Sequence, residues 1–451
     1  MPLLERDSLA ALTAALDRLE GGFAHLPVND AARPTDAAML QRVLAEVADR
    51  LHDNYPYFHP LYAGQMLKPP HPVARAAYAL ATWINPNNHA RDGGRASSEM
   101  EIEAVHEIAS MFGFERDFLG HLTSGGTFAN LEALWVSGQL APGKTILASE
   151  QAHYTHARIS AVLKLPFETV TVDARGRMDL ASLEARLRRG DIATVVVTLG
   201  TTACGAVDPL HEILPLARRY GARVHVDSAY GGYFTLVTDL DEEVRDAYGA
   251  ISQADSVVID PHKHGLQPYG CGCILFRDAS VGRFYKHDSP YTYFTSDQLH
   301  LGEISLECSR AGAAAVALWA TQRALPLKRG GEFAQQLLDC RSAAVDLHSR
   351  ISASERFVAP FAPQLDIVVW AVRSTNLATS SRLAQEIFER AAERDLHLAL
   401  VELPVKFFPS ATFSQPTTDH VTCLRSVLMK PEHNLWINSV WKRLLDASNI
   451  C

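Results

Sequence analysis

The middle of the chain alternates short, strongly apolar runs with stretches of helical pattern, and this alternation limits the fold more than any other feature. The apolar runs lie at residues 145–148, 169–172, 194–199, 223–226, 256–259 and 272–276. They are rich in β-branched residues and continuous, which is typical of strands buried on both faces of a parallel sheet. Residues 180–189 and 209–220 have the pattern of crossover helices. The sequence therefore predicts an α/β fold with a large, doubly wound, mostly parallel sheet.

The regions on either side of these strands divide the 451 residues into three predicted segments. Residues 1–95 are predicted to form an N-terminal arm, helical at first and then irregular, because prolines cluster between residues 55 and 72. Residues 96–329 are predicted to form the large sheet domain, opening with a helix that Ser98 caps with Glu101 as its partner. The glycine pair at 330–331 marks a joint, followed by a smaller α+β domain of residues 330–451.

Composition excludes several classes of function. Hydrophobic residues make up 47% of the chain and charged residues 21%, which is ordinary for a globular protein with a sizeable core. The formal net charge of −9 argues against a nucleic-acid partner, which needs a basic face. No apolar run is long enough to suggest a signal peptide or membrane span. Seven scattered cysteines without a pairing framework or a metal-binding pattern predict free thiols, no metal centre and a cytoplasmic location.

Lys263 is the first candidate for chemistry, because the run Asp260-Pro261-His262-Lys263-His264-Gly265 follows the strand predicted at 256–259. Parallel α/β sheets bind ligands at the carboxyl ends of their strands. A lysine in a partly dry pocket there has a depressed pKa and can form an imine with an aldehyde. Taken alone, Lys263 is better explained as an ordinary surface lysine.

Asp227 ends the strand predicted at 223–226 and precedes two glycines at 231–232. A carboxylate here suits pyridoxal 5′-phosphate (PLP), whose pyridine nitrogen must stay protonated if the ring is to accept electrons. Taken alone, Asp227 is equally well explained as a turn residue or a helix N-cap.

Three further polar motifs accompany the predicted strands and helices. The run Ser124-Gly125-Gly126-Thr127 precedes a helical stretch, where free backbone N–H groups bind phosphate, although simple helix capping is as good an explanation. His153 follows the run at 145–148 and suits stacking on a planar cofactor and handling protons, or a purely structural role. Thr202 follows the run at 194–199. Five polar motifs, each next to a different predicted strand or helix, are better explained by a shared cofactor site than by separate structural accidents.

The sequence resembles the group II PLP-dependent amino-acid decarboxylases, the family of glutamate, aromatic amino-acid and archaeal tyrosine/aspartate decarboxylases. The likeness extends from about residue 55 to 445 and includes Pro261-His262-Lys263, the passage at 305–312 and the stretch at 424–429. It implies PLP fold type I and a homodimer with active sites at the subunit interface. It also implies a Schiff base between Lys263 and PLP, with Asp227 on the pyridinium nitrogen, Ala229 packed on the ring and His153 stacked on it. The phosphate and ring-anchoring residues implied are Ser124, Gly125, Gly126, Thr127, Thr202 and His262.

The resemblance also implies the reaction, which is decarboxylation of an L-amino acid to an amine and CO₂. Members of the family usually deliver the final proton to the α-carbon from a tyrosine on a mobile loop. The corresponding stretch here, residues 286–295, holds two candidates, Tyr291 and Tyr293, and His153 is a third possible donor.

Other assignments remain open on the sequence. A PLP-dependent carbon–carbon or carbon–sulfur lyase of related fold, such as a sphingosine-phosphate-lyase-like enzyme, an amino-transfer enzyme and a non-catalytic PLP-binding protein are alternatives. The predicted substrate is either acidic, aspartate or glutamate, or aromatic, tyrosine. Arg91 and Arg95 could hold a distal carboxylate, which favours the acidic substrate slightly, whereas Tyr78, Trp83 and Ile84 suit an aromatic one.

Overall fold

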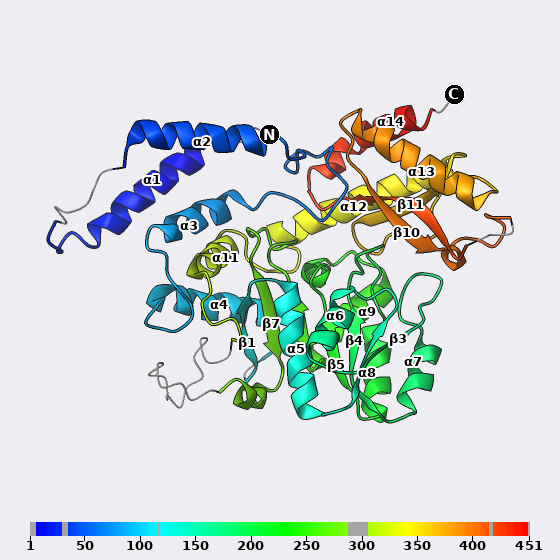
Figure 1. Ribbon diagram of the computed structural model, residues 1–451, viewed down its shortest axis with the longest axis horizontal. Helices are drawn as coiled ribbons and strands as arrows, with labels where there is room; N and C mark the ends of the chain where they lie inside the picture. The colour runs from blue at the N-terminus through cyan, green and yellow to red at the C-terminus, as the bar shows by residue number, and fades with distance from the viewer. Residues whose placement is uncertain (1–5, 29–34, 116, 287–304, 415–417, 450–451) are drawn as a thin grey trace.

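The computed structural model describes residues 6–28, 35–115, 117–286, 305–414 and 418–449. Figure 1 shows a large sheet layered between helices, a smaller sheet beside α12 to α14, and an N-terminal helical pair standing away from both. The helices of the N-terminal and large-sheet regions are α1 (Arg6–Gly21), α2 (Ala37–Leu51), α3 (Pro72–Thr82), α4 (Arg95–Met111), α5 (Gly126–Leu140), α6 (Thr155–Val162), α7 (Leu180–Leu187), α8 (Leu210–Arg219), α9 (Glu242–Gly249) and α11 (Gly312–Ala324). The later helices are α12 (Glu332–Ala353), α13 (Leu377–Ala392) and α14 (His433–Ser448).

The large sheet has the strand order β1-β7-β6-β5-β4-β2-β3. Its strands are β1 (Leu119–Thr123), β2 (Thr145–Ser149), β3 (Phe167–Val170), β4 (Ile192–Thr198), β5 (Arg223–Asp227), β6 (Ser256–Ile259) and β7 (Gly272–Phe276). Neighbouring strands from β3 to β6 run parallel, and β7 runs opposite to β6 and β1. The prediction of a mostly parallel, doubly wound sheet is therefore confirmed.

The sheet is held by apolar side chains on both of its faces. The inner strands β2, β4, β5 and β6 are buried almost along their whole lengths, and Val195, Val226 and Ile259 have no measurable exposure. Burying each such side chain contributes about 1.5–3 kcal/mol, so the interior strands are fixed by the same apolar continuity that identified them. Their carboxyl ends consequently form a rigid edge.

The start of α4 differs from the sequence prediction. The helix begins at Arg95 with Gly94 as its N-cap, so Ser98 lies inside the first turns and does not cap it. The Glu101 carboxylate is buried, accepts from the Leu122 backbone N–H at 3.0 Å and pairs with Arg310 at 2.6 Å. A buried carboxylate must be paired, so the tertiary ion pair takes precedence over the local capping box. The predicted stop at Gly113 is confirmed, because this residue has φ +75° just after the helix.

The small domain contains a four-stranded sheet of order β10-β11-β9-β8. Its strands are β8 (Phe357–Val358), β9 (Ile367–Val372), β10 (Ala399–Pro404) and β11 (His420–Val427), all paired antiparallel. The arm joins this sheet, since Ala63 donates its N–H to the His397 carbonyl and accepts from the Val427 N–H. The sequence prediction missed β8, because a strand of two residues is too short to show an alternation of apolar and polar side chains.

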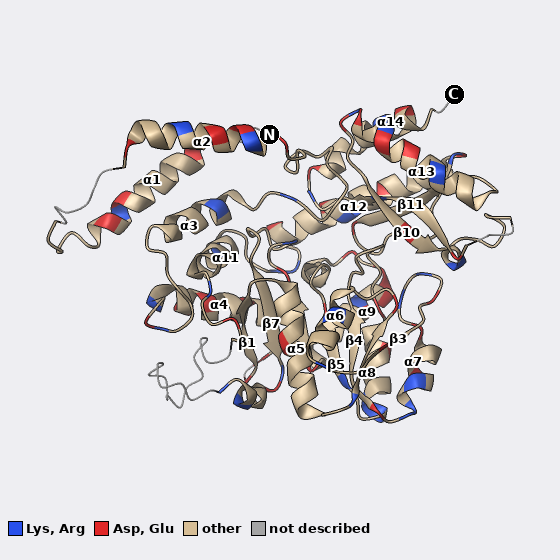
Figure 2. Ribbon diagram, in the orientation of Figure 1, with Lys and Arg blue, Asp and Glu red and all other residues tan. Residues whose placement is uncertain are grey.

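The helical pair α1–α2 contributes little to either core. Neither helix has a buried residue, and α2 exposes apolar side chains along one face. Figure 2 shows acidic and basic residues interspersed along the helices of the molecule. Within the described ranges, no helix is both long and apolar enough to cross a membrane.

Candidate active site

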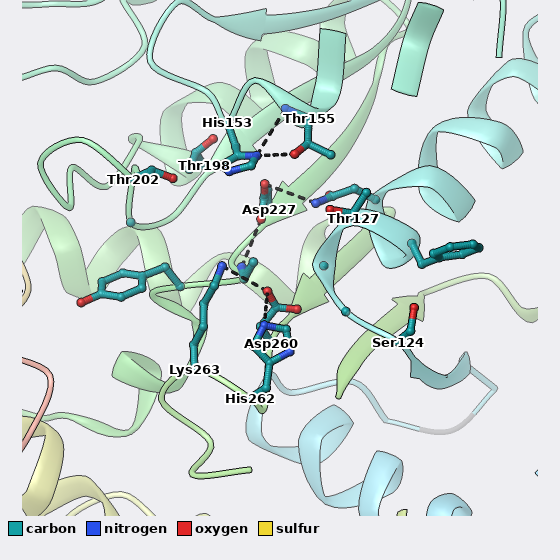
Figure 3. A pocket seen from close by; sticks show the side chains of 17 residues that line it. Ser124, Thr127, His153, Thr155, Thr198, Thr202, Asp227, Asp260, His262 and Lys263 are labelled. Carbon is teal, nitrogen blue, oxygen red and sulfur yellow. Dashed lines mark hydrogen bonds and ion pairs between the residues drawn. The ribbon is translucent and has the colours of Figure 1, made fainter. Parts of the chain in front are cut away.

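A cavity of about 330 Å³ opens where the carboxyl ends of β2, β4, β5 and β6 meet the first turn of α5. The residues expected from the sequence to bind the cofactor all line it: Ser124, Gly125, Gly126, Thr127, His153, Thr202, Asp227, Ala229, His262 and Lys263. Figure 3 shows Lys263 and Asp227 directed into the same space, with His153 on one side and Asp260 and His262 on the other. Motifs that are up to 139 positions apart in the chain (Ser124 to Lys263) therefore meet at one edge of the sheet.

Asp227 is the most heavily supported side chain of the cavity. Its Oδ2 lies 2.8 Å from His156 Nε2 and accepts from Asn130 Nδ2 at 3.4 Å, while Oδ1 accepts from the Ala229 backbone N–H at 3.1 Å. Burial alone would raise the pKa of this carboxyl, but the hydrogen bond and charge of His156, together with the charge of Lys263, hold its pKa well below the ordinary value. The cavity thus contains a carboxylate that stays ionised.

A second layer of buried residues orients this carboxylate. His225 Nε2 lies 2.8 Å from Asn130 Oδ1, and its Nδ1 lies 2.8 Å from the Ser256 hydroxyl. Because the Asn130 oxygen can only accept, His225 donates from Nε2 and accepts the Ser256 hydroxyl at Nδ1. Burial, reinforced by the charge of His156, lowers the pKa of His225 to about 3, so this histidine stays neutral. The amide of Asn130 is thereby fixed with its NH₂ group toward Asp227.

Lys263 lies in the connection between β6 and β7, beside a second carboxylate. Its Nζ is 3.1 Å from Asp260 Oδ2, and the same oxygen is 3.5 Å from His262 Nε2. Burial lowers the pKa of His262, although Asp260 opposes this. Asp260 Oδ1 and His262 Nδ1 are buried without a hydrogen-bond partner among the described residues. Buried polar atoms of this kind indicate that a ligand or a water molecule provides their hydrogen-bond partners.

The start of α5 forms an anion-binding wall. Its N-cap, Gly125, provides no side-chain hydrogen bond, so the first-turn N–H groups stay available toward the cavity. A Cβ on Gly126 would lie 2.7 Å from the Asp260 carboxylate, and φ at Gly125 is +151°, where side chains are rarely tolerated. Gly126 is therefore required by the close approach of Asp260, and Gly125 by its backbone conformation. The Ser124 N–H is already used, because it donates to Glu307 Oε2 at 2.8 Å.

His153 faces the cavity in a defined tautomer. Its Nδ1 contacts the Thr155 hydroxyl and accepts from the Thr155 backbone N–H at 3.3 Å. Burial lowers the pKa of His153, opposed by Asp227 and reinforced by Lys263, which favours the neutral ring. With Nδ1 accepting, the proton of a neutral His153 resides on Nε2.

A buried carboxylate of the small domain contacts the cavity wall from behind. Asp366 Oδ1 accepts from the Tyr230 hydroxyl at 2.6 Å, and Oδ2 lies 3.2 Å from His264 Nε2. Asp366 and His264 are fully buried, Tyr230 lines the cavity, and His264 is the neighbour of Lys263 in the chain. The small domain is thus joined to the lysine segment by polar contacts.

These parts fit PLP, the cofactor expected from the sequence. The uncapped helix start suits a phosphate, the ionised Asp227 suits a protonated pyridine nitrogen, and the Lys263 amine suits an aldehyde. Asp260 and His262, which carry the unpartnered atoms, lie between Lys263 and the first turn of α5.

The remaining predicted residues lie elsewhere. Tyr291 and Tyr293 fall outside the described residues. Arg91 is exposed and paired with Glu99, and Arg95 is the first residue of α4 rather than part of a loop. The exposed Trp83 and Ile84 follow α3, which contains Tyr78. None of these described residues lines the cavity in its own chain.

Sequence reasoning missed several residues of the cavity and its support. The further lining residues are Phe128, Asn130, Thr155, Thr198, Gly200, Tyr230 and Asp260. His156, which contacts Asp227, was also missed, although it lies three residues after His153. Asp260 opens the run that contains Lys263, and Asn130 lies three residues after Thr127, so their polar character was the available signal.

Comparison with known proteins gives consistent results at three levels. Residues 25–373 match the model of the pyridoxal-dependent decarboxylase conserved domain. The chain is 27% identical to an L-tyrosine decarboxylase of Enterococcus faecium, over 78% of this chain and 76% of that protein. It is 32% identical to a probable L-aspartate decarboxylase of Halobacterium salinarum, over 58% of this chain and 70% of that protein. A structure of Oryza sativa TDC with PLP and tryptamine superimposes with a TM-score of 0.79 at 17% identity, covering 99% of each chain.

Proposed function

We propose that the cavity at the carboxyl edge of the large sheet is the active site of this chain, which belongs to the pyridoxal-dependent decarboxylase family. The chain is a PLP-dependent amino-acid decarboxylase of fold type I. One observation carries the assignment of the site: Lys263 and Asp227, from the ends of adjacent strands, face the same cavity opposite the uncapped start of α5.

Each residue has a proposed task toward the cofactor. When bound, PLP supplies an electron sink for the electron pair that remains at the α-carbon as CO₂ leaves. Lys263 would hold the cofactor through its amine, and the first turn of α5 would bind the phosphate. Asp227, kept ionised by His156, would keep the proton on the pyridine nitrogen. Ala229 would contact the ring, and His153 would present its Nε2–H for proton transfer.

Reduction with borohydride tests this assignment directly. We expect the purified holoenzyme to be yellow and, after reduction and proteolysis, to carry a pyridoxyl group on the peptide that contains Lys263. Mass spectrometry locates the modified residue. Modification of Lys406, which pairs with Glu150 outside the cavity, or of any other lysine instead would overturn the assignment.

For the substrate we propose an L-amino acid with an aromatic side chain, with an acidic side chain as the alternative. Tyrosine decarboxylases and a probable aspartate decarboxylase are both among the relatives. The guanidinium of Arg91 is already paired with Glu99, and neither Arg91 nor Arg95 lines the cavity of its own chain. An acidic substrate would therefore need an arginine from a second subunit.

Competition between tyrosine, aspartate and glutamate, scored as CO₂ release, distinguishes the two classes. The same assay is run on Arg91→Ala and Arg95→Ala. Loss of an arginine that clamps an acidic substrate should cost about 2–5 kcal/mol of transition-state binding. Aspartate turnover that falls in either variant supports the acidic substrate, whereas tyrosine turnover unaffected by both supports the aromatic one.

We further propose that the enzyme is a homodimer and that the arm, residues 1–95, takes part in the interface. The apolar face of α2, formed by Leu40, Val43, Leu44, Val47 and Leu51, is 43–60% exposed although its spacing is that of a buried helix face. Light scattering should report a dimer for the parent and for Arg42→Glu, and a monomer for Leu44→Glu with Val47→Glu. A monomeric parent would contradict the proposal.

A cytoplasmic location and the segment boundaries 1–95, 96–329 and 330–451 are also proposals. The six cysteines in the described ranges are all free thiols, which supports a reducing compartment. The glycine joint supports the second boundary, since Gly330 has φ +67° and α12 begins two residues later. Limited proteolysis that cuts near residues 95 and 330 before other sites would support these boundaries.

A further inference from the structure

A second cavity, of about 610 Å³, lies on the other side of the lysine segment. It is bordered by the proline-rich entry into α3, by α12 and by the first turn of α14, three elements that Figure 1 places around the junction of the arm and the small domain. Among the residues that the structure describes, the two cavities have no lining residue in common. Leu266, three residues after Lys263, forms part of its wall.

Two lysines in this wall have no carboxylate partner in the described part of the chain. The Lys430 side chain is 3% exposed, and its Nζ donates to the Tyr62 carbonyl at 2.7 Å and the Leu67 carbonyl at 3.3 Å. Lys68 Nζ donates to the Met429 carbonyl at 3.2 Å. Carbonyl dipoles and, for Lys430, the Tyr62 ring at 5.2 Å compensate only partly for burying an ammonium group, so two such groups in one cavity favour an anion.

The electrostatics of Lys430 support this reading. Burial and the neighbouring charge of Lys68 lower its pKa to about 7, against the opposing effects of Glu432 and Cys340. Burial likewise lowers the pKa of Lys68. An anion in contact with these two amines would add to the negative charge of Glu432, which also lines the cavity, and stabilise their protonated forms.

Beyond the two lysines, the wall combines apolar side chains with six polar ones, which are His71, Arg75, Gln336, Asp339, Glu432 and Asn434. Phe58, Pro69, Pro70 and Leu266 contribute to it, and Leu435, 84% exposed, stands at its edge. Proline and aromatic surfaces contact apolar groups without losing side-chain freedom, so they suit the body of an organic ligand better than a hydrated inorganic ion.

We propose that this cavity binds a small organic carboxylate with an apolar body about the size of a phenyl group, its carboxylate lying between Lys68 and Lys430. The site is separate from the decarboxylation site and does not depend on the assignment of that site. Because Leu266 has φ +64° and accepts the His71 N–H at 2.9 Å, the wall of this cavity is continuous with the segment that carries Lys263. The ligand therefore has a direct structural route to the active site.

Titration calorimetry of the holoenzyme with phenylacetate tests the proposal. We expect one molecule bound per chain, with 2-phenylethanol, which lacks the charge, and inorganic phosphate, which lacks the apolar body, each binding at least about ten-fold more weakly. Lys68→Met should weaken phenylacetate binding about ten-fold or more. Lys442→Met, an exposed lysine on α14 outside the cavity, should not change it.

Several results would overturn the proposal. These are the absence of phenylacetate binding, equal binding of 2-phenylethanol or phosphate, and parent-like affinity in Lys68→Met. If Lys430→Met fails to fold, Lys68→Met and Leu435→Ser still test the charged and apolar parts of the site separately. Phenylacetate that acts only as a competitor of the amino-acid substrate, with Lys68→Met unchanged, would place it in the active site and contradict the second site.

Discussion

Two carboxylates from neighbouring strands face the active-site cavity, yet their surroundings are opposite. Asp227 has a partner for each oxygen, through His156, Asn130 and the Ala229 N–H. Asp260 contacts Lys263 and His262 with one oxygen, and its other oxygen is buried without a partner among the described residues. Both side chains are almost fully buried, so exposure does not explain the difference.

The two ends of the site are therefore prepared differently. The Asp227 end is complete in the protein alone, because its charge is fixed by buried hydrogen bonds before any ligand arrives. The Lys263 end keeps unsatisfied atoms and an uncapped helix start, which a bound cofactor would complete. The first end should therefore respond to substitution through electrostatics, and the second through cofactor attachment.

The largest effect is expected for Lys263→Ala, which removes the group that attaches the cofactor. Turnover should fall by about 1000-fold or more, since the lysine attaches the cofactor. The cofactor absorbance and steady-state decarboxylation are measured together. Lys144→Ala, at an exposed lysine outside the cavity, is the matched control. A Lys263→Ala enzyme with near-parent turnover would contradict the proposed active site.

Asp227→Asn should be next in size, with an expected loss of about 100-fold in kcat. The amide is nearly isosteric but carries no charge, so the pyridine nitrogen loses the group that keeps it protonated. Cofactor affinity should change much less than kcat, because the phosphate wall and Lys263 are unchanged. Fluorescence titration of the apo variant with PLP gives the affinity. An equal loss in affinity and kcat would indicate a structural defect instead.

His156→Ala removes the side chain that supports Asp227, and an activity loss of about ten-fold is expected. His156 depresses the pKa of Asp227, so its removal raises that pKa. The ionised form is then lost at a higher pH as the solution is acidified, and kcat/KM should fall more steeply toward pH 5 than in the parent. His211→Ala, on α8 and outside the cavity, is the control. Parallel pH profiles would show that His156 does not act through Asp227.

Asp260→Asn should have the smallest effect, a few-fold change, because its contacts are incomplete before the cofactor binds. We expect the change mainly in PLP affinity, with kcat of the loaded enzyme close to the parent value. Gly126→Ala serves as the comparison at the same place, since its added Cβ meets the Asp260 carboxylate at 2.7 Å and should weaken PLP binding more. A kcat loss in Asp260→Asn as large as in Asp227→Asn would remove the distinction between the two ends.

The sheet was predictable because its signal is local. The runs at 256–259 and 272–276 coincide with β6 and β7, which are buried along their whole lengths and, apart from Ser256, contain no polar side chain. In contrast, β1 has the sequence Leu-Gly-His-Leu-Thr, in which a glycine and a buried histidine hide the apolar pattern. β3 begins two residues before the predicted run, since its polar residues face outward at the edge of the sheet.

The cavity-lining residues were predictable for a related reason. Strand ends in a parallel sheet share one edge, so polar residues at those positions converge without knowledge of the packing. The supporting residues could not be predicted, because their contacts join distant positions. His156 and Asp227 are 71 residues apart, and Asp366 and Tyr230 are 136 residues apart. Glu101 shows the converse error, in which a local capping pattern concealed a buried ion pair.

The contact of Asp366 with Tyr230 and His264 has a consequence for how the molecule unfolds. A small domain on a glycine joint would ordinarily be able to melt by itself. Here its departure would break the buried hydrogen bond between the Tyr230 hydroxyl and the Asp366 carboxylate, and a hydrogen bond to a charged group contributes about 1.5–3 kcal/mol. The two domains should therefore unfold in a single cooperative transition, and the polypeptide around the reactive lysine should be among the last backbone to exchange its amide hydrogens with solvent.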